Sequence, residues 1–169
     1  MSALLKTLLV LIAASFLSAP GPVDAAPRQG QPVPDFRVTS TSGQAISQKN
    51  YRGYVLILDF FATWCPPCRQ SIPHLVELNR KYGKQGLQIL GMSVDEDGKE
   101  AVKSFGDEFR INYPLALAGD STVADFGIRS VPVMYLMDKK GKIVEVYRGF
   151  TDEMGSSMEQ TIKRLLAEK

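Results

Sequence analysis

An apolar segment followed at once by two closely spaced cysteines constrains the fold of this chain most. Residues 54–62 (YVLILDFFA) are rich in Val, Ile and Phe, which predicts a strand buried on both faces of a sheet. The motif W-C-P-P-C follows at residues 64–68, and apolar residues then recur at helical spacing until Gly83. We therefore expect a buried strand that leads through a Cys-x-x-Cys turn into a helix.

The remaining sequence alternates between strand and helix patterns, which predicts an α/β fold with a mixed sheet and helices on both faces. An amino-terminal β-hairpin is expected to come before the buried strand, and a second hairpin is expected to form around the turn at 138–141. We expect Asp120 or Ser121 to cap a short helix, and Thr151 to cap the last one. The other predicted strands are 36–39, 45–46, 87–94, 113–118, 133–137 and 142–147, and a helical stripe runs from 101 to 109.

The first 25 residues have the pattern of a secretory signal peptide: an early lysine, an apolar run at 8–17 and small residues before Ala25. The alternative is an uncleaved anchor, although the run is shorter than the roughly 20 residues of a membrane span. Both predict an extracytoplasmic protein, in the periplasm or on the outer face of the cytoplasmic membrane, with cysteines in an oxidising compartment. Residues 26–34 are expected to be a linker, and 35–169 one domain.

Composition excludes several classes of site in this chain of 169 residues. With 20 basic and 18 acidic residues the net charge is +2, so no nucleic-acid surface is indicated. Two cysteines and one histidine are too few for a four-ligand Cys/His zinc site, and we expect no metal and no cofactor. His74, on the helix after the cysteines, is expected to be a solvated surface residue rather than a ligand or base.

The Cys-x-x-Cys turn predicts redox chemistry. A helix amino terminus favours an anion, so we expect Cys65 to be the attacking thiolate and Cys68, within the first turn, to resolve a mixed disulfide. The alternative is an inert disulfide. A bridge that closes so small a loop removes little chain entropy, so it is a poor structural crosslink, and the redox interpretation is favoured.

The segment FFATWCPPC resembles the active site of thioredoxin-fold proteins. Pro73, five residues after Cys68, and Val131-Pro132, just before a strand, match positions of the same family. The long segment 95–132 resembles the TlpA/ResA-like branch of exported, often membrane-tethered disulfide reductases, some of which serve cytochrome c maturation. The resemblance implies a thioredoxin-like fold with a central helix–strand insertion, protein disulfide substrates and a membrane thiol–disulfide electron donor.

Two positions bear on the branch. Ser71 stands where the cytochrome-maturation proteins commonly have a glutamate three residues after the second cysteine. Asp59 matches the buried aspartate of thioredoxins, while the lysine that accompanies it there is replaced at about Gly91. These departures favour a more general disulfide reductase, with apocytochrome c remaining among the candidate substrates.

Asp59 is also notable without the resemblance, because it is the only charge within 54–62. Burial without a partner raises the pKa of a carboxyl group, so Asp59 is expected to titrate near neutral pH. Such a group can accept the Cys68 proton as that thiol attacks the mixed disulfide, which is the role in thioredoxins. The alternative is an aspartate at a strand end that faces water.

The candidate substrate-binding residues are Trp64, Pro66, Val131 and Pro132. The resemblance implies a cis bond before Pro132 that brings the Val131 backbone beside Cys65, where it pairs with an extended substrate segment. Trp64 and Pro66 are expected to supply apolar contact beside the reactive sulfur. The alternatives are a proline that begins an edge strand and a tryptophan that only packs.

The leading hypothesis is an exported, monomeric thiol–disulfide oxidoreductase that reduces protein disulfides, with membrane contact only through an uncleaved anchor. An oxidase with the same chemistry is the first alternative. A peroxidase is disfavoured because Ala62 stands where such sites commonly have a threonine, three residues before the cysteine. The third alternative is a non-catalytic carrier that holds copper on Cys65 and Cys68, since soft thiolates suit Cu(I).

Overall fold

A five-stranded mixed sheet forms the centre of the part of the chain that the computed structural model describes, residues 26–168. Its middle strand, β3 (Val55–Phe61), is buried along its whole length, which confirms the predicted buried strand. β3 pairs in parallel with β4 (Leu87–Ser93) on one side and antiparallel with β6 (Val133–Met137) on the other. The strand that leads into the cysteines is therefore held by hydrogen bonds on both edges.

The outer strands complete the sheet in the order β5-β4-β3-β6-β7. β5 (Leu115–Leu117) pairs in parallel with β4, and β7 (Ile143–Arg148) forms the expected hairpin with β6. The predicted amino-terminal hairpin is also present, as β1 (Arg37–Thr39) and β2 (Ala45–Ser47). Short 3-10 turns follow β2 and the first long helix at Gln48–Tyr51 and Gly83–Gln85.

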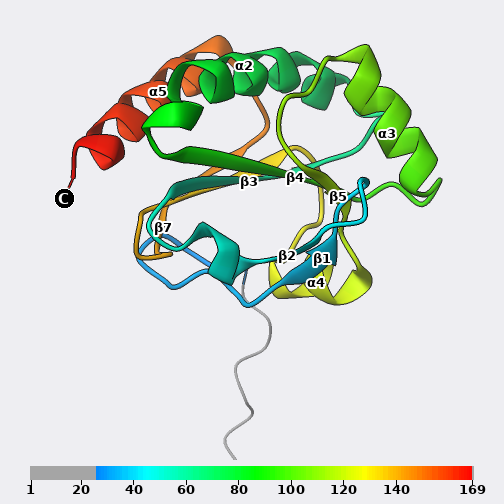
Figure 1. Ribbon diagram of the computed structural model, residues 1–169, viewed down its shortest axis with the longest axis horizontal. Helices are drawn as coiled ribbons and strands as arrows, with labels where there is room; N and C mark the ends of the chain where they lie inside the picture. The colour runs from blue at the N-terminus through cyan, green and yellow to red at the C-terminus, as the bar shows by residue number, and fades with distance from the viewer. Residues whose placement is uncertain (1–25, 169) are drawn as a thin grey trace, which may run out of the picture.

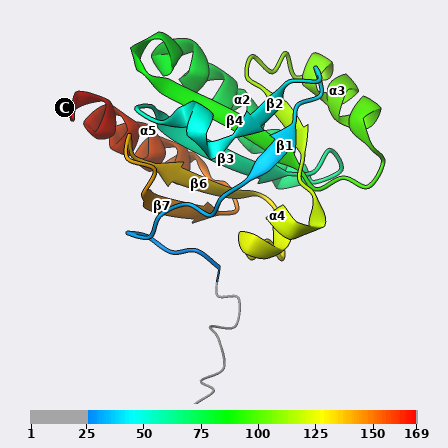
Figure 2. The same ribbon diagram turned by 60° about the horizontal axis from the view of Figure 1, so that its bottom comes forward.

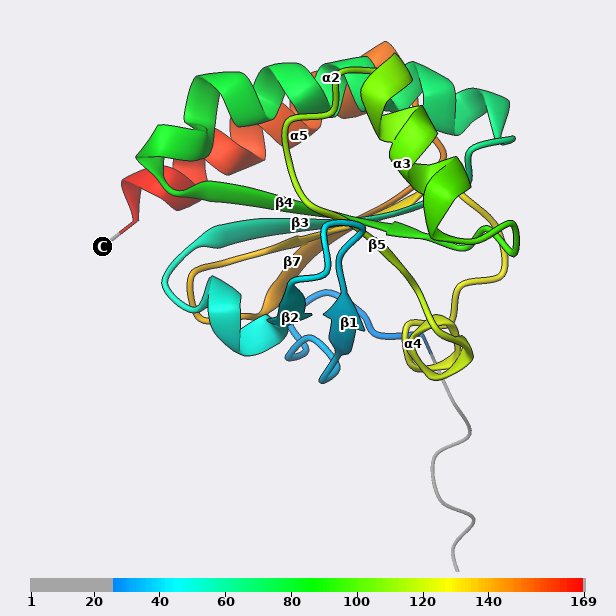
Figure 3. The ribbon, with the colours of Figure 1, turned by 45° about the vertical axis from the view of Figure 1, so that its right-hand side comes forward.

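Helices cover the two faces of the sheet unequally (Figures 1 and 3). The helices α2 (Pro66–Tyr82), α3 (Lys99–Glu108) and α5 (Asp152–Ala167) lie on one face. The short helix α4 (Asp120–Asp125) and the β1–β2 hairpin lie on the other. Each face therefore has its own apolar core, separated by the sheet.

The alternation of side chains along β3 decides which core Asp59 enters. Ile57 and Phe61 belong to the core beneath α2 and α5, whereas Leu58 and Phe60 belong to the core on the α4 side. Because side chains alternate along a strand, Asp59 lies on the same face as Ile57 and Phe61. The only charge of β3 thus lies on the face that also carries the cysteine-bearing helix.

The two capping predictions have opposite outcomes. Thr151 caps α5, and its hydroxyl accepts a hydrogen bond from the Met154 amide at 3.2 Å, as expected. The cap expected at Asp120 or Ser121 is wrong, because Gly119 has the extended backbone of the cap position and supplies no side chain. α4 therefore begins one residue earlier than the polar residues suggested, and Asp120 lies inside its first turn.

Residues 26–34, expected to be a linker, run beside the start of β7 (Figure 2). The Gly30 amide donates to the Ile143 carbonyl at 2.7 Å, and the Ile143 amide donates to the Gln31 carbonyl at 2.9 Å. The Val33 amide donates to the Gly141 carbonyl at 3.0 Å. This segment is consequently attached to the β6–β7 hairpin.

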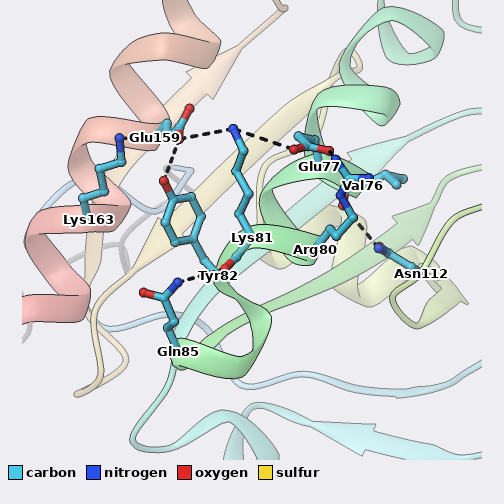
Figure 4. A network of polar contacts seen from close by, with 9 residues as sticks. All are labelled: Val76, Glu77, Arg80, Lys81, Tyr82, Gln85, Asn112, Glu159 and Lys163. Carbon is cyan, nitrogen blue, oxygen red and sulfur yellow. Dashed lines mark hydrogen bonds and ion pairs between the residues drawn. The ribbon is translucent and has the colours of Figure 1, made fainter.

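The carboxyl-terminal end of α2 is joined to α5 by a polar network (Figure 4). The Tyr82 hydroxyl donates to the Glu159 carboxylate at 2.6 Å. The Lys81 ammonium lies 3.7 Å from both Glu77 and Glu159, and Lys163 lies 3.5 Å from Glu159. Such exposed ion pairs stabilise a protein by about 1 kcal/mol at most, so the network adds little to the stability of the fold.

Within residues 26–168, no helix has both the length and the apolar character needed to span a bilayer. The predicted signal peptide or anchor at 1–25 lies outside the described residues.

Candidate active site

The two cysteines form a disulfide at the amino terminus of α2. Cys65 is the cap residue, and its sulfur accepts a hydrogen bond from the Cys68 amide at 3.3 Å. Cys65 is 4% exposed, whereas Cys68 is fully buried behind it. The first cysteine is thus the one that an incoming sulfur can approach.

The local sequence explains this geometry. Pro66 and Pro67 occupy the first two helical positions, where a missing N–H removes no helical hydrogen bond. The first free amide of the helix is therefore that of Cys68, and it points to the Cys65 sulfur. An amide donor and the helix dipole both favour negative charge on Cys65 once the disulfide is reduced.

A second loop reaches the same sulfur from the other side of the fold. The Val131-Pro132 peptide bond is cis, as the resemblance implied. The Val131 carbonyl oxygen lies 3.6 Å from the Cys65 sulfur. Pro132 is buried, and its carbonyl accepts from the Gly149 amide at 2.9 Å, which ties the loop to the end of β7. Val131 therefore brings backbone beside Cys65.

An apolar groove of about 370 Å³ lies beside this contact. Trp64 forms one wall and is 67% exposed, so it is not a packing residue of the core. Pro66 is exposed in the first turn of α2 and does not line the groove. The lining residues are Trp64, Val94, Val123, Ile128, Arg129, Ser130 and Val131.

Asp59 is fully buried, and among the described residues neither of its carboxylate oxygens has a hydrogen-bond partner. Burial raises the pKa of this carboxyl to about 7. In the sheet Asp59 lies opposite Gly91 on β4 and Met134 on β6. The predicted buried, near-neutral carboxyl is present. Ser71, at the position of the family glutamate, is buried too, and its hydroxyl donates to the Cys68 carbonyl at 3.0 Å.

Close packing explains the absence of a basic partner at position 91. A Cβ atom on Gly91 would lie 2.5 Å from the Leu115 side chain and 3.5 Å from the Tyr113 ring. The Tyr113 hydroxyl is buried without a partner among the described residues. Burial raises the pKa of this hydroxyl, and the nearby charge of Asp59 raises it further. No local spacing in the sequence indicates Tyr113, whose ring packs beside the space that a side chain at Gly91 would fill.

His74 is not the solvated surface residue that the sequence suggested. Its side chain is half-buried between α2 and α5, and its Nε2 atom is buried without a partner among the described residues. The ring centroid lies 5.7 Å from that of Phe150. A Cβ atom on Gly155 would come within 3.1 Å of the imidazole, so the glycine allows α5 to approach this closely.

Two side chains that the sequence analysis missed hold Thr63, two residues before Cys65. The Asp95 carboxylate accepts from the Thr63 amide at 3.0 Å and from its hydroxyl at 2.6 Å, and also from the Ser93 hydroxyl. Arg69 of α2 donates to the Thr63 carbonyl at 3.3 Å and pairs with Glu108. Asp95 lies 30 residues after Cys65 in the chain, so no local spacing indicates this contact.

Asp95→Asn is expected to lower the free energy of unfolding by about 1.5–3 kcal/mol, because charge-assisted hydrogen bonds to Thr63 and Ser93 are lost. Urea titration of the oxidised protein measures the change. The control is Asp97→Asn, which removes an exposed carboxylate two residues away. Equal stability of the two variants would show that Asp95 does not hold the active-site turn.

Comparison with known proteins agrees with this geometry. The family model described as the AhpC/TSA family matches residues 29–146, which is more than half of the chain. The chain belongs to the AhpC/TSA family. The thioredoxin-like fold and the ResA-like relationship predicted from the sequence are both confirmed.

Similar proteins include the thiol-disulfide oxidoreductase ResA of Bacillus thuringiensis subsp. konkukian, 31% identical over 137 residues, or 80% of this chain and 78% of ResA. The thioredoxin-like protein YneN of Bacillus subtilis is 31% identical over 123 residues, 72% of each chain. A thiol:disulfide interchange protein of Chlorobium tepidum superposes with a TM-score of 0.74 at 28% identity, covering 85% of this chain and all of the other. This AhpC/TSA-family protein is a thiol–disulfide oxidoreductase.

Proposed function

We propose that the protein reduces disulfides of extracytoplasmic proteins, with Cys65 as nucleophile and Cys68 as resolving cysteine. The observation that carries this proposal is the placement of Cys65, which caps α2, lies beside the groove of Trp64 and Val131, and covers the buried Cys68. The signal-like segment 1–25 and the likeness to ResA support the location.

The reaction begins from the reduced pair. The Cys65 thiolate attacks one sulfur of the substrate disulfide, forms a mixed disulfide and releases the other sulfur as a thiolate, which takes up a proton. Cys68 then loses its proton, attacks the Cys65 sulfur and releases the second substrate thiol. Two electrons pass to the substrate, and the disulfide seen in the structure remains. A membrane dithiol donor restores the reduced pair by the reverse exchange.

Asp59 is proposed to accept the Cys68 proton. It lies on the core side of β3 that packs against α2, where Cys68 is fully buried and has no access to bulk water. A carboxyl whose pKa is about 7 is divided between its charged and neutral forms at neutral pH. Such a group can take up and return a proton without a large free-energy cost.

The substrate segment is proposed to lie along Val131 with its cysteine at Cys65. The Val131 carbonyl, 3.6 Å from the sulfur, offers a backbone acceptor at the reacting atoms. Extended segments gain affinity from such backbone pairing, and pockets for their side chains give specificity. Trp64 and Pro132 flank this path, and exposed Pro66 is proposed to touch the substrate from the helix side.

Reduction is proposed over oxidation because the direct contacts that favour a thiolate on Cys65 come from the helix terminus alone, namely the Cys68 amide and the helix dipole. That effect is worth about 0.3–1 kcal/mol. His74, the one histidine of the chain, packs between α2 and α5 rather than over Cys65. A modestly stabilised thiolate corresponds to a potential nearer thioredoxin's, about −270 mV, than that of the oxidant DsbA, about −120 mV.

Thr63 argues against a peroxidase. Ala62 occupies the position at which such sites commonly have a threonine, and the neighbouring Thr63 hydroxyl is already donated to Asp95 at 2.6 Å. It is therefore not directed at a peroxide bound on Cys65.

The test is insulin reduction with a dithiol donor, together with equilibration against glutathione buffers. We expect the insulin chains to separate. We also expect the reduction potential to lie nearer thioredoxin's value of about −270 mV than the DsbA value of about −120 mV. Cys65→Ser is the inactive control. A potential near the oxidant's value would contradict the reductase assignment.

Reduction of apocytochrome c, measured in the same way, decides whether apocytochrome c is a substrate of this protein. Added Cu(I) that binds tightly while insulin stays intact would favour the carrier alternative.

A further inference from the structure

A second hollow, of about 690 Å³, lies next to the apolar groove. Residues from the amino-terminal segment 26–29, the loop before Val131 and the edge strand β7 line it together. Arg129 and Ser130 line both hollows, so the two lie side by side. We call the second hollow, defined by Arg28, Arg129 and Arg148, the arginine pocket.

The charges of the arginine pocket are unbalanced. Three arginines line it, all exposed, against the single carboxylate of Glu145. That carboxylate accepts hydrogen bonds from the Tyr147 hydroxyl at 2.6 Å and the Thr161 hydroxyl at 3.4 Å. In the part of the chain from 26 to 168, no ion pair involves any of the three arginines. The pocket therefore presents guanidinium groups without a counter-charge from its own fold.

The pocket lies close to the reacting sulfur. Arg129 precedes Val131 by two residues, a distance of about 7 Å along an extended chain. Arg148 lies opposite Val133 in the β6–β7 register, one residue beyond the cis proline. A segment that extends along Val131 thus carries side chains into the pocket within a few residues of its cysteine.

We propose that the arginine pocket binds acidic side chains of the substrate protein, close in sequence to the cysteine that reacts with Cys65. The inference rests on the proposed reduction and names its substrate class. Arginine matches a carboxylate through two parallel N–H···O bonds, and charge-assisted bonds of this kind are stronger than neutral ones. Opposite charge also speeds the encounter of the two proteins, and this effect weakens as salt rises.

The test uses disulfide-linked peptide pairs that differ only in Glu or Gln two residues from the cysteine. We expect kcat/KM to be about tenfold higher for the Glu peptide in low salt, equivalent to about 1.4 kcal/mol, and the preference to shrink in high salt. In Arg28→Gln/Arg148→Gln the preference for the Glu peptide over the Gln peptide is expected to fall severalfold. The control Arg37→Gln removes an exposed arginine of β1, outside the pocket, and is expected to keep the preference.

Equal rates for the Glu and Gln peptides would overturn the arginine pocket and leave the proposed reduction intact. The arginine pocket is also overturned if Arg28→Gln/Arg148→Gln prefers the Glu peptide as strongly as Arg37→Gln does. Failure to reduce any peptide, with insulin also intact, would overturn the proposed function and this inference with it.

Discussion

Cys68→Ala is expected to accumulate mixed disulfides between Cys65 and substrate proteins and to lose all turnover. The variant keeps Cys65 beside the groove at the start of α2, so the first exchange still takes place. The sulfur that would release the substrate is absent, and the adduct has no intramolecular route to resolve. Non-reducing gels and mass spectrometry of the adducts measure the effect, and the captured proteins identify the substrates.

Cys65→Ser is the matched control, because it removes the accessible sulfur and leaves the fully buried one. It is expected to form no adduct and to show no activity. The double variant Cys65→Ser/Cys68→Ala reports any background capture. If adducts form on Cys65→Ser and none form on Cys68→Ala, the assigned roles of the two cysteines are reversed.

The strands and helices near the cysteines could be predicted because their signals are local. The apolar run 54–62 and the helical spacing after it place β3 and α2 within one or two residues of the observed bounds. Thr151 is predictable as a cap because its side chain bonds to an amide three residues on. Gly119 is not, since glycine caps by backbone conformation and leaves no side-chain signal.

The residues of the active site also differ in whether a local sequence signal indicates them. Cys65, Cys68 and the buried charge of Asp59 are visible in the sequence, because each depends on neighbours within a few residues. Asp95 reaches Thr63 across 32 positions, and Tyr113 comes near Asp59 only because Gly91 leaves space between strands. The burial of His74 is hidden for a related reason, since it depends on the close approach of Gly155, 81 residues further along the chain.

Groups of like charge from distant segments are equally hidden. Arg28 and Arg148 are 120 residues apart in the chain, and they line one pocket because residues 30–33 pair with the start of β7 and the turn before it. A net charge of +2 for the whole chain gives no indication of this concentration.

Asp59→Asn is expected to raise the free energy of unfolding above pH 7 by roughly 4 kcal/mol. Burial raises the pKa of Asp59 to about 7, whereas the unfolded chain has a value near the ordinary 3.8. Between these values the folded protein holds a proton that the unfolded chain has lost, so the stability of the parent falls as pH rises through this window. Each tenfold change in proton affinity is worth about 1.4 kcal/mol, which sets the size of the effect.

Urea titrations of the oxidised protein from pH 4 to 8 test this sign, with the exposed Asp97→Asn as control. The gain from Asp59→Asn is expected to shrink toward zero as pH falls to the ordinary carboxyl pKa near 4, since the unfolded chain then begins to take up the same proton. Turnover of the variant is expected to fall, most clearly near neutral pH, because the Cys68 proton loses its acceptor inside the core. The proposal is contradicted if Asp59→Asn is less stable than the parent and reduces insulin at the parent's rate. Asp59 would then be a structural residue, because its carboxyl would not be needed for the transfer of the Cys68 proton.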